Sequence, residues 1–249
     1  MTTRIFGSGI RRREDPRLIT GGATFTDDVQ LPGMAHAAIL RSPHAHAKIN
    51  SIDTAAASEA PGVVAVYTGA DTDGVLNPIP CAWLPPDCDI KAVAHPAIAK
   101  DVVRYQGDAV AVVVAETRYQ AEDALELINV DYEVLPPVID PDIAADEATP
   151  VIHPDIGTNV AMRSVQEGGD IEAAFSQADH VVRQMYRVPR LAPSPLETRG
   201  VIGDYDPAED FLTVWDSTQA PHQVKRYLAQ MLERPEETAG LILLGAVSN

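Results

Sequence analysis

The sequence predicts a mixed α and β protein, of the α+β class, built from two successive parts. Short β-rich runs alternate with helical patterns through the first half of the chain. Prolines and acidic residues between Pro136 and Pro154 then interrupt every periodicity, which marks a boundary. Beyond it, further strand-like runs lead into one amphipathic helix. With 249 residues, 45% of them hydrophobic, each part has enough apolar material for a core.

The first part covers residues 21–137. An arm, residues 1–20, precedes it and contains both arginines and acidic residues. Strand-like runs bounded by proline or glycine are Ala35–Leu40, Val63–Tyr67 and Ala109–Val114, and a return strand is expected at Tyr132–Leu135. The clearest helix follows Glu116. Thr117 and Gln120 have capping-box spacing there, and an apolar stripe recurs at i, i+3, i+4 and i+7: Ala121, Ala124, Leu125 and Ile128. This stripe predicts a helix packed on a sheet.

The second part, residues 151–249, follows a linker at 138–150. Asp170 is expected to cap a short helix that carries Ile171, Ala174 and Phe175. Three strands are then predicted: His180–Val188, Thr198–Tyr205 and Phe211–Trp215. The last helix begins near Pro221, where a missing N–H is tolerated, and its predicted buried stripe is Val224, Leu228, Met231 and Leu232.

Composition excludes several classes of function. The formal charge of −17 would repel nucleic acid phosphates and anionic membrane surfaces. The longest apolar runs are far shorter than the roughly 20 residues of a membrane-spanning helix, and no secretory signal pattern is present, so a cytoplasmic location is expected. Cys81 and Cys88 are the two cysteines, too few for an iron–sulfur cluster. We expect them to be reduced loop thiols, and the alternatives are a labile disulfide or half of a metal site.

Five segments, taken in order, carry a resemblance to a known family. They are Arg12–Leu18, Arg41–Ala47, Pro61–Gly69, Gly107–Ala115 and Trp215–His222. Together they resemble the large, molybdopterin-binding subunit of the xanthine dehydrogenase and aldehyde oxidase family, in particular the aerobic carbon monoxide dehydrogenase type. The resemblance implies that residues 21–137 form the family's α/β hammerhead domain and that residues 151–249 begin its first molybdenum-cofactor-binding domain. It also implies a molybdopterin cofactor, and iron–sulfur and flavin subunits as partners.

The resemblance assigns one cofactor contact to this chain. In the family, the glutamine that matches Gln219 donates a hydrogen bond to the apical oxo group of the molybdenum centre. An amide is a neutral donor, and the positive end of the helix dipole near Pro221 points to the same place. By position alone, Gln219 could instead satisfy backbone groups in a strand-to-helix turn. A further matching segment, Leu196–Gly200, contains Glu197, and we expect this residue at most to support the pocket through hydrogen bonds.

The chain also departs from the family pattern. Members of the family continue into a Gly-Gly-Gly-Phe-Gly loop, further pterin contacts and a glutamate base, none of which is present in the sequence. We therefore expect no complete catalytic set and no metal ligands in this chain. The resemblance implies part of an enzyme that hydroxylates an aldehyde, a heteroaromatic or a carbon-monoxide-type substrate, from a truncated or split subunit. A cofactor-free assembly module that binds partner subunits, or a non-functional gene fragment, are the alternatives.

Three histidines near the start of the first part are candidates for a metal site. His44 and His46 fall on one face of an extended segment at i and i+2, with His36 nearby in the sequence. Pro43 shapes this segment, and the resemblance assigns it to the hammerhead scaffold. A structural role is therefore the prediction.

Overall fold

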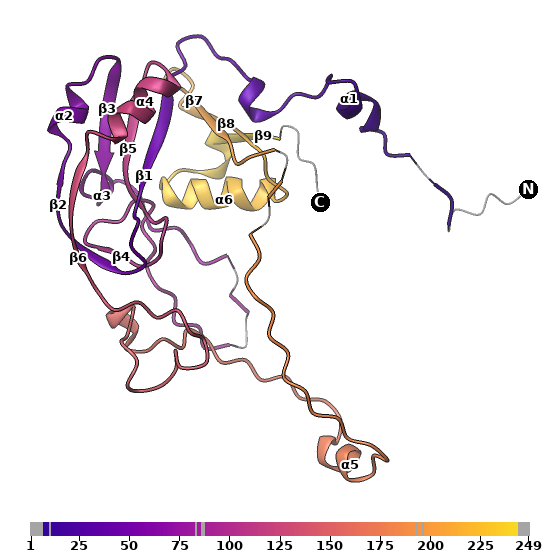
Figure 1. The fold of residues 1–249 in the computed structure, drawn as a ribbon. Coiled ribbons are helices and arrows are strands. Elements are labelled where there is room, and N and C mark those ends of the chain that lie inside the picture. The colour runs from indigo at the N-terminus through magenta and orange to yellow at the C-terminus, as the bar shows by residue number, and fades with distance from the viewer. Residues whose placement is uncertain are drawn as a thin grey trace, which may run out of the picture. The chain divides into compact units, whose positions relative to one another are not determined.

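The computed structural model describes residues 7–9, 11–82, 84–85, 88–192, 194–195 and 197–243 (Figure 1). The chain forms two compact units: a central unit, Ala35–Ala192, and a terminal unit made of Met1–Met34 and Pro193–Asn249. The domain limits expected near residues 137 and 151 stay a prediction. Residues 1–6 and 10 of the expected arm lie outside the described residues, and the rest of the arm includes α1, Asp15–Ile19, with no buried residue.

The central unit contains two antiparallel sheets. The first has the strand order β1-β5-β3 and the second β4-β2-β6. The strands are β1 His36–Arg41, β2 Ala47–Asp53, β3 Val63–Thr68, β4 Val102–Val103, β5 Ala109–Ala115 and β6 Asn129–Val134. The runs predicted for β1, β3 and β5 are confirmed, and the predicted return strand is present as β6 but begins earlier, at Asn129. β2 was missed because polar residues interrupt its apolar ones, and pairing with β6 is what makes it a strand.

The helices of the central unit are short. They are α2 Ala55–Ser58, α3 Gly69–Thr72, α4 Arg118–Leu125, the 3-10 turn η2 Pro154–Ile156 and α5 Ile171–Ser176. Two predicted caps are confirmed. The side chain of Thr117 accepts the Gln120 N–H at the start of α4, and the side chain of Asp170 accepts the Ala173 N–H at the start of α5.

The core of the central unit is built around β5, which pairs with both β1 and β3. Small side chains allow α4 to lie close to this sheet: Ala121 and Ala124 of the predicted stripe are 1% and 0% exposed. They pack in one cluster with alternate β5 residues, among them Ala111 and Val113. The apolar stripe of α4 thus packs as the sequence predicts.

The terminal unit holds a sheet of order β7-β8-β9 with β7 Val201–Asp206, β8 Phe211–Asp216 and β9 Ala239–Leu243. β8 and β9 are parallel, and α6, Pro221–Met231, connects them and packs against β9. The 3-10 turns η1 Thr26–Asp28 and η3 Glu236–Thr238 complete the unit. The residues of the predicted α6 stripe are only half-buried. The buried residue of this helix is instead Ala229, which is 4% exposed.

One predicted strand is wrong. His180–Val188 forms no strand, and its residues are exposed. The alternation of apolar and polar side chains is that of a strand, but a strand also needs a hydrogen-bonded neighbour, and the backbone of this segment has none among the described residues. The strand predicted at Thr198–Tyr205 is present as β7 but begins at Val201, where pairing with β8 starts.

No helix in the described part of the chain is both long and apolar enough to span a bilayer.

Candidate functional site at the entry to α6

The turn between β8 and α6 presents Gln219. β8 ends at Asp216, and α6 begins at Pro221, whose ring favours the first helical position. The hydroxyl of Thr218 accepts the N–H of Ala220 at 3.2 Å, which stabilises the turn from within. The backbone N–H group of the turn is therefore satisfied by Thr218 and not by Gln219.

The side chain of Gln219 is exposed and makes no hydrogen bond to any other described residue. No side chain caps α6 either, so the N-terminal end of this helix keeps its partial positive charge open to a ligand. An unengaged amide donor and an open helix N-terminus therefore lie next to each other. Both favour an electron-rich oxygen.

Glu197 joins distant parts of the terminal unit. Its Oε1 accepts the N–H of Thr26 at 3.2 Å and the hydroxyl of Thr26 at 3.4 Å, across 171 residues of sequence. Thr26 is 3% exposed and lies in η1. The other oxygen, Oε2, is buried and has no partner among the described residues. A buried carboxylate oxygen without a donor is unfavourable, which leaves this atom able to accept a further hydrogen bond.

Asp216, at the end of β8, is the second acid of this region. Partial burial raises the pKa of its carboxyl group, the Ser217 N–H lowers it, and the negative charge of Glu197 raises it again. Asp216 pairs in register with Val201 of β7, the strand that begins shortly after Glu197. The fold therefore brings two carboxylates within electrostatic reach beside the turn that carries Gln219.

Replacing Asp216 with asparagine tests whether the charged carboxylate of Asp216 destabilises the terminal unit. The raised pKa means that the folded state binds the proton more readily than the unfolded state, so stability is lost as pH rises from the unfolded pKa through the folded pKa. We expect Asp216→Asn to raise the melting temperature by roughly 1–3 °C at pH 7 and to change nothing at about pH 3, where both states are protonated. Thermal melts at both pH values would measure this, and a fall at pH 7 would show that the charged form stabilises the unit.

The structure places the sequence-predicted residues in one unit and adds two that the sequence analysis missed. Gln219 and Glu197 both belong to the terminal unit. Asp216 and Thr26 were missed. The signal for Asp216 was its place between an apolar strand and a turn, whereas nothing in the sequence linked Thr26 to Glu197.

The histidines and cysteines considered as metal ligands lie in surroundings that give them structural roles. Nδ1 of His46 lies 2.9 Å from the carbonyl oxygen of Pro136, and the His44 ring meets Tyr132 edge-on at 5.0 Å. Cys81 and Cys88 form no disulfide within the described part of the chain. In the described ranges, no group of three or more His, Cys, Asp or Glu side chains is arranged to hold a metal ion.

Comparisons with known proteins match both parts of the chain. Residues 20–136 match the family model of the aldehyde oxidase and xanthine dehydrogenase a/b hammerhead domain. Residues 152–242 match that of the molybdopterin cofactor-binding domain.

The relatives are large subunits of oxidoreductases. The nicotine 6-hydroxylase large subunit of Paenarthrobacter nicotinovorans is 42% identical over 97% of this chain and 29% of its own length. The carbon monoxide dehydrogenase large chain of Afipia carboxidovorans is 38% identical over 95% of this chain and 30% of its own. The crystal structure of quinoline 2-oxidoreductase from Pseudomonas putida 86 superimposes with a TM-score of 0.86 at 36% identity, over 96% of this chain and 30% of that one.

The chain thus spans about 29–30% of the length of these relatives. Its fold is that of the hammerhead domain followed by the start of the molybdenum-cofactor-binding domain. The order of motifs, the two family models and the superposition agree. The chain belongs to the xanthine dehydrogenase and aldehyde oxidase family, which includes the carbon monoxide dehydrogenase large chains, and it corresponds to an N-terminal portion of the large subunits of that family.

Proposed function

We propose that this chain is the part of a molybdenum hydroxylase large subunit that presents Gln219 to the molybdopterin cofactor. The observation that carries the proposal is the exposed amide of Gln219, which has no hydrogen bond within the described chain and lies at the uncapped N-terminus of α6. When bound, the cofactor supplies two-electron hydroxylation chemistry. The whole activity requires the rest of the subunit, with iron–sulfur and flavin subunits as electron acceptors.

The residues on either side hold Gln219 in place. Asp216 is fixed at the end of β8 and takes the Ser217 N–H, and Thr218 takes the Ala220 N–H. These local bonds are made by its neighbours, and the exposed amide of Gln219 takes part in none of them. A neutral donor orients an electron-rich oxygen without adding a charge to the site, and the helix N-terminus adds a favourable field. The amide donor of Gln219 and the uncapped N-terminus of α6 therefore fit an electron-rich oxygen of the cofactor.

The substrate class that we propose first is an aromatic nitrogen heterocycle. The support is the similarity to a nicotine 6-hydroxylase subunit at 42% identity and to a quinoline 2-oxidoreductase at a TM-score of 0.86. Aldehydes and carbon monoxide are the other substrates that the family takes. The cytoplasmic location inferred from the sequence stays a prediction.

Reconstitution tests this function. The chain is co-expressed with the remaining polypeptide of a large subunit and with iron–sulfur and flavin subunits, and hydroxylation of quinoline, nicotine, an aldehyde and carbon monoxide is assayed with an artificial electron acceptor. We expect turnover of a heterocycle with molybdenum in the purified complex. A complex that assembles and melts cooperatively but contains neither molybdenum nor pterin would support the cofactor-free assembly module instead.

A further inference from the structure

The β7–β8 hairpin carries the Gln219 turn at one of its two ends. At the tip, β7 leads into β8 between Asp206 and Phe211, which are paired in register. At the open end, Val201 is paired with Asp216, and the chain continues from Asp216 into the turn with Gln219. The orientation of Gln219 therefore depends on how firmly the open end of this hairpin is fixed.

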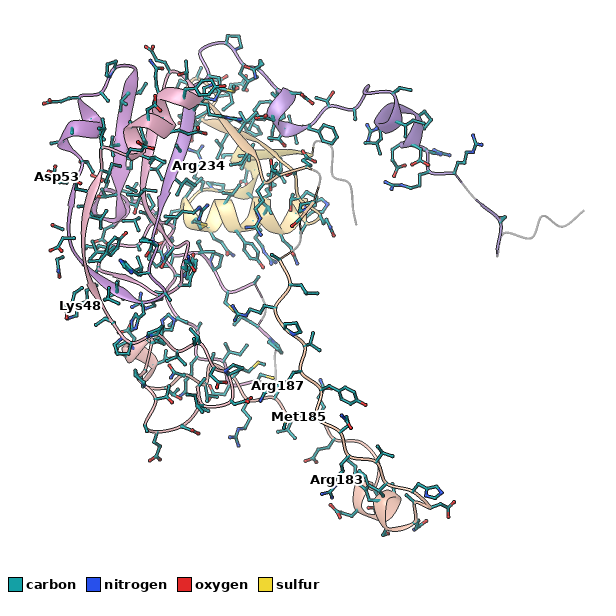
Figure 2. The ribbon with its side chains drawn as sticks, in the orientation of Figure 1. Lys48, Asp53, Arg183, Met185, Arg187 and Arg234 are labelled. Atoms are coloured by element: carbon teal, nitrogen blue, oxygen red, sulfur yellow. The ribbon has the colours of Figure 1, made fainter. Side chains whose placement is uncertain are left out.

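Arg234 fixes the tip of the hairpin (Figure 2). Its Nη2 donates to Oδ1 of Asp210 at 2.7 Å, and its Cζ lies 5.3 Å from the centre of the Tyr205 ring. The hydroxyl of Tyr205 donates to the same carboxylate oxygen at 2.7 Å. Because Arg234 follows α6, these contacts tie the C-terminal end of the helix to the tip. All of them lie at the tip, so the open end has to be held by other groups.

Thr26 and Glu197 hold the open end. The two hydrogen bonds that Thr26 donates to Oε1 of Glu197 attach the segment before β7 to η1. Gly200, the last residue before β7, lies close to the same side chain: a Cβ atom on Gly200 would be 3.2 Å from Cβ of Thr26. Thr26 thus lies against both Glu197 and Gly200, immediately before the strand that pairs with Asp216.

The turn that contains Thr26 is itself held by hydrogen bonds. In η1, the N–H of Phe25 donates to the carboxylate of Asp28 at 2.9 Å, and the N–H of Val29 donates to the carbonyl of Thr26 at 3.2 Å. Thr26 therefore presents its two donors from a fixed backbone, at little cost in conformational entropy. It lies in the range 20–136 that matches the hammerhead model, yet it belongs to the same compact unit as β7 and β8.

The contact between Thr26 and Glu197 contributes more to position than to stability. The hydrogen bonds at Oε1 are favourable, but the buried Oε2 has no donor among the described residues, and its desolvation offsets much of their gain. Burial raises the pKa of the Asp216 carboxyl and the charge of Glu197 raises it further, so two adjacent carboxylates are unfavourable at neutral pH. A contact that adds little stability but joins distant segments beside the Gln219 turn acts on the geometry of that turn.

We propose that Thr26 is a positioning residue for Gln219, and that it acts through Glu197 on the open end of the β7–β8 hairpin. Its hydrogen bonds fix the segment before β7, pairing with β7 fixes Asp216, and the turn that follows holds the amide of Gln219 in one orientation toward the cofactor. This role requires no contact between Thr26 and the cofactor. The inference rests on the proposed function of Gln219 and adds a residue from outside the range 152–242 that matches the cofactor-binding model.

Hydrogen exchange of the full chain tests the positioning step without the cofactor. Glu197→Ala removes the acceptor of both Thr26 bonds, whereas Arg234→Ala removes the contacts at the tip. Well below the melting temperatures, we expect Glu197→Ala to speed exchange of the amides of 214–220 about ten-fold, and Arg234→Ala to speed that of 205–211 instead. Glu197→Gln keeps an oxygen acceptor for Thr26 and should exchange as the parent chain does.

Two outcomes of this measurement would overturn the proposal. One is unchanged exchange of 214–220 in Glu197→Ala. The other is equal acceleration of these amides in Glu197→Ala and Arg234→Ala, which would indicate a general loss of stability.

If Glu197→Ala does not fold, Thr26→Val decides, because it keeps the shape and the backbone N–H of Thr26 and removes only the hydroxyl bond. It should speed exchange of 214–220 about two- to three-fold, and Thr26→Ser should not. Parent-like exchange in Thr26→Val would then overturn the proposal.

The assembled enzyme tests the effect on the site. At full molybdenum content, we expect Thr26→Val to lower kcat about two- to five-fold with KM unchanged, and to alter the electron paramagnetic resonance signal of the partly reduced centre. Thr26→Ser should restore both. Thr20→Val is the matched control and should change neither, since the hydroxyl of the exposed Thr20 donates to the carbonyl of Pro16 at 2.6 Å. Arg234→Ala should lower the melting temperature and leave the signal unchanged. A parent-like signal and kcat in Thr26→Val would overturn the proposal.

Failure of this inference and failure of the proposed function have different signatures. If Gln219→Ala alters the signal while Thr26→Val changes neither the signal nor the exchange of 214–220, only this inference fails. If exchange responds to Glu197→Ala as expected but Gln219→Ala leaves the signal of the loaded enzyme unchanged, the proposed function fails, and Thr26 orders the turn without positioning a cofactor contact.

Discussion

Replacing Gly69 with alanine is expected to lower the stability of the central unit by about 2–3 kcal/mol. Gly69 is the buried first residue of α3. A Cβ atom there would lie 2.5 Å from the carbonyl oxygen of Ala99 and 2.7 Å from Cα of Lys100. These are backbone atoms, and rotating a side chain cannot relieve the overlap, so the chain at 99–100 must move.

That movement would reach the sheet. The N–H of Ala99 donates to the carbonyl of Ala109 at 2.7 Å, at the start of β5, and Ala99 is 2% exposed. We expect the melting temperature to fall by about 5–10 °C, with faster hydrogen exchange at Ala111 and Val113.

Gly168→Ala is the matched control. A Cβ at Gly168 meets nothing within 4 Å, and its backbone does not need the left-handed conformation. This change should be neutral or slightly stabilising. Equal melting temperatures for the two variants would show that the close approach at Gly69 does not limit the stability of the unit.

The second large effect is expected at Gln219, in the assembled enzyme. Gln219→Ala removes a hydrogen-bond donor to a polar group, which corresponds to a loss of about 10- to 100-fold in kcat. Gln219→Glu should lose at least as much, because a carboxylate only accepts hydrogen bonds and adds a negative charge where the site favours a donor. The side chain makes no bond within the described chain, so neither change should alter the melting temperature.

Gln223→Ala provides the control on the same helix, since Gln223 is also exposed and carries the same amide. It should keep wild-type kcat. Molybdenum content and the electron paramagnetic resonance signal of the partly reduced centre separate the two possible roles of Gln219. A change of signal at full metal content indicates contact with the cofactor, whereas unchanged signal and turnover in both Gln219 variants would remove Gln219 from the site.

The sequence was sufficient to predict an element wherever local features alone specify it. Helix α4 was predicted because its cap, its stripe and its length are all local features, and Ala121 and Ala124 pack as expected. Strand β5 has a near-continuous apolar run, so its burial could also be predicted.

Features that depend on distant partners could not be predicted in this way. The bond between Glu197 and Thr26 spans 171 residues, and no local pattern specifies it. The segment His180–Val188 shows the opposite failure. Its alternation of apolar and polar residues predicted a strand, and that prediction is wrong because the described chain offers no neighbour to complete the hydrogen-bond ladder. The position of Gln219 in a strand-to-helix turn was predicted, whereas the closeness of Asp216 to Glu197 emerged only from the fold.

A crystal structure of the complex assembled from this chain and the remaining large-subunit polypeptide tests the central claim most directly. The account predicts a bound molybdopterin cofactor with Nε2 of Gln219 at hydrogen-bond distance, about 2.7–3.2 Å, from one of its oxygen atoms. A cofactor bound elsewhere, with the side chain of Gln219 in bulk water, would contradict it.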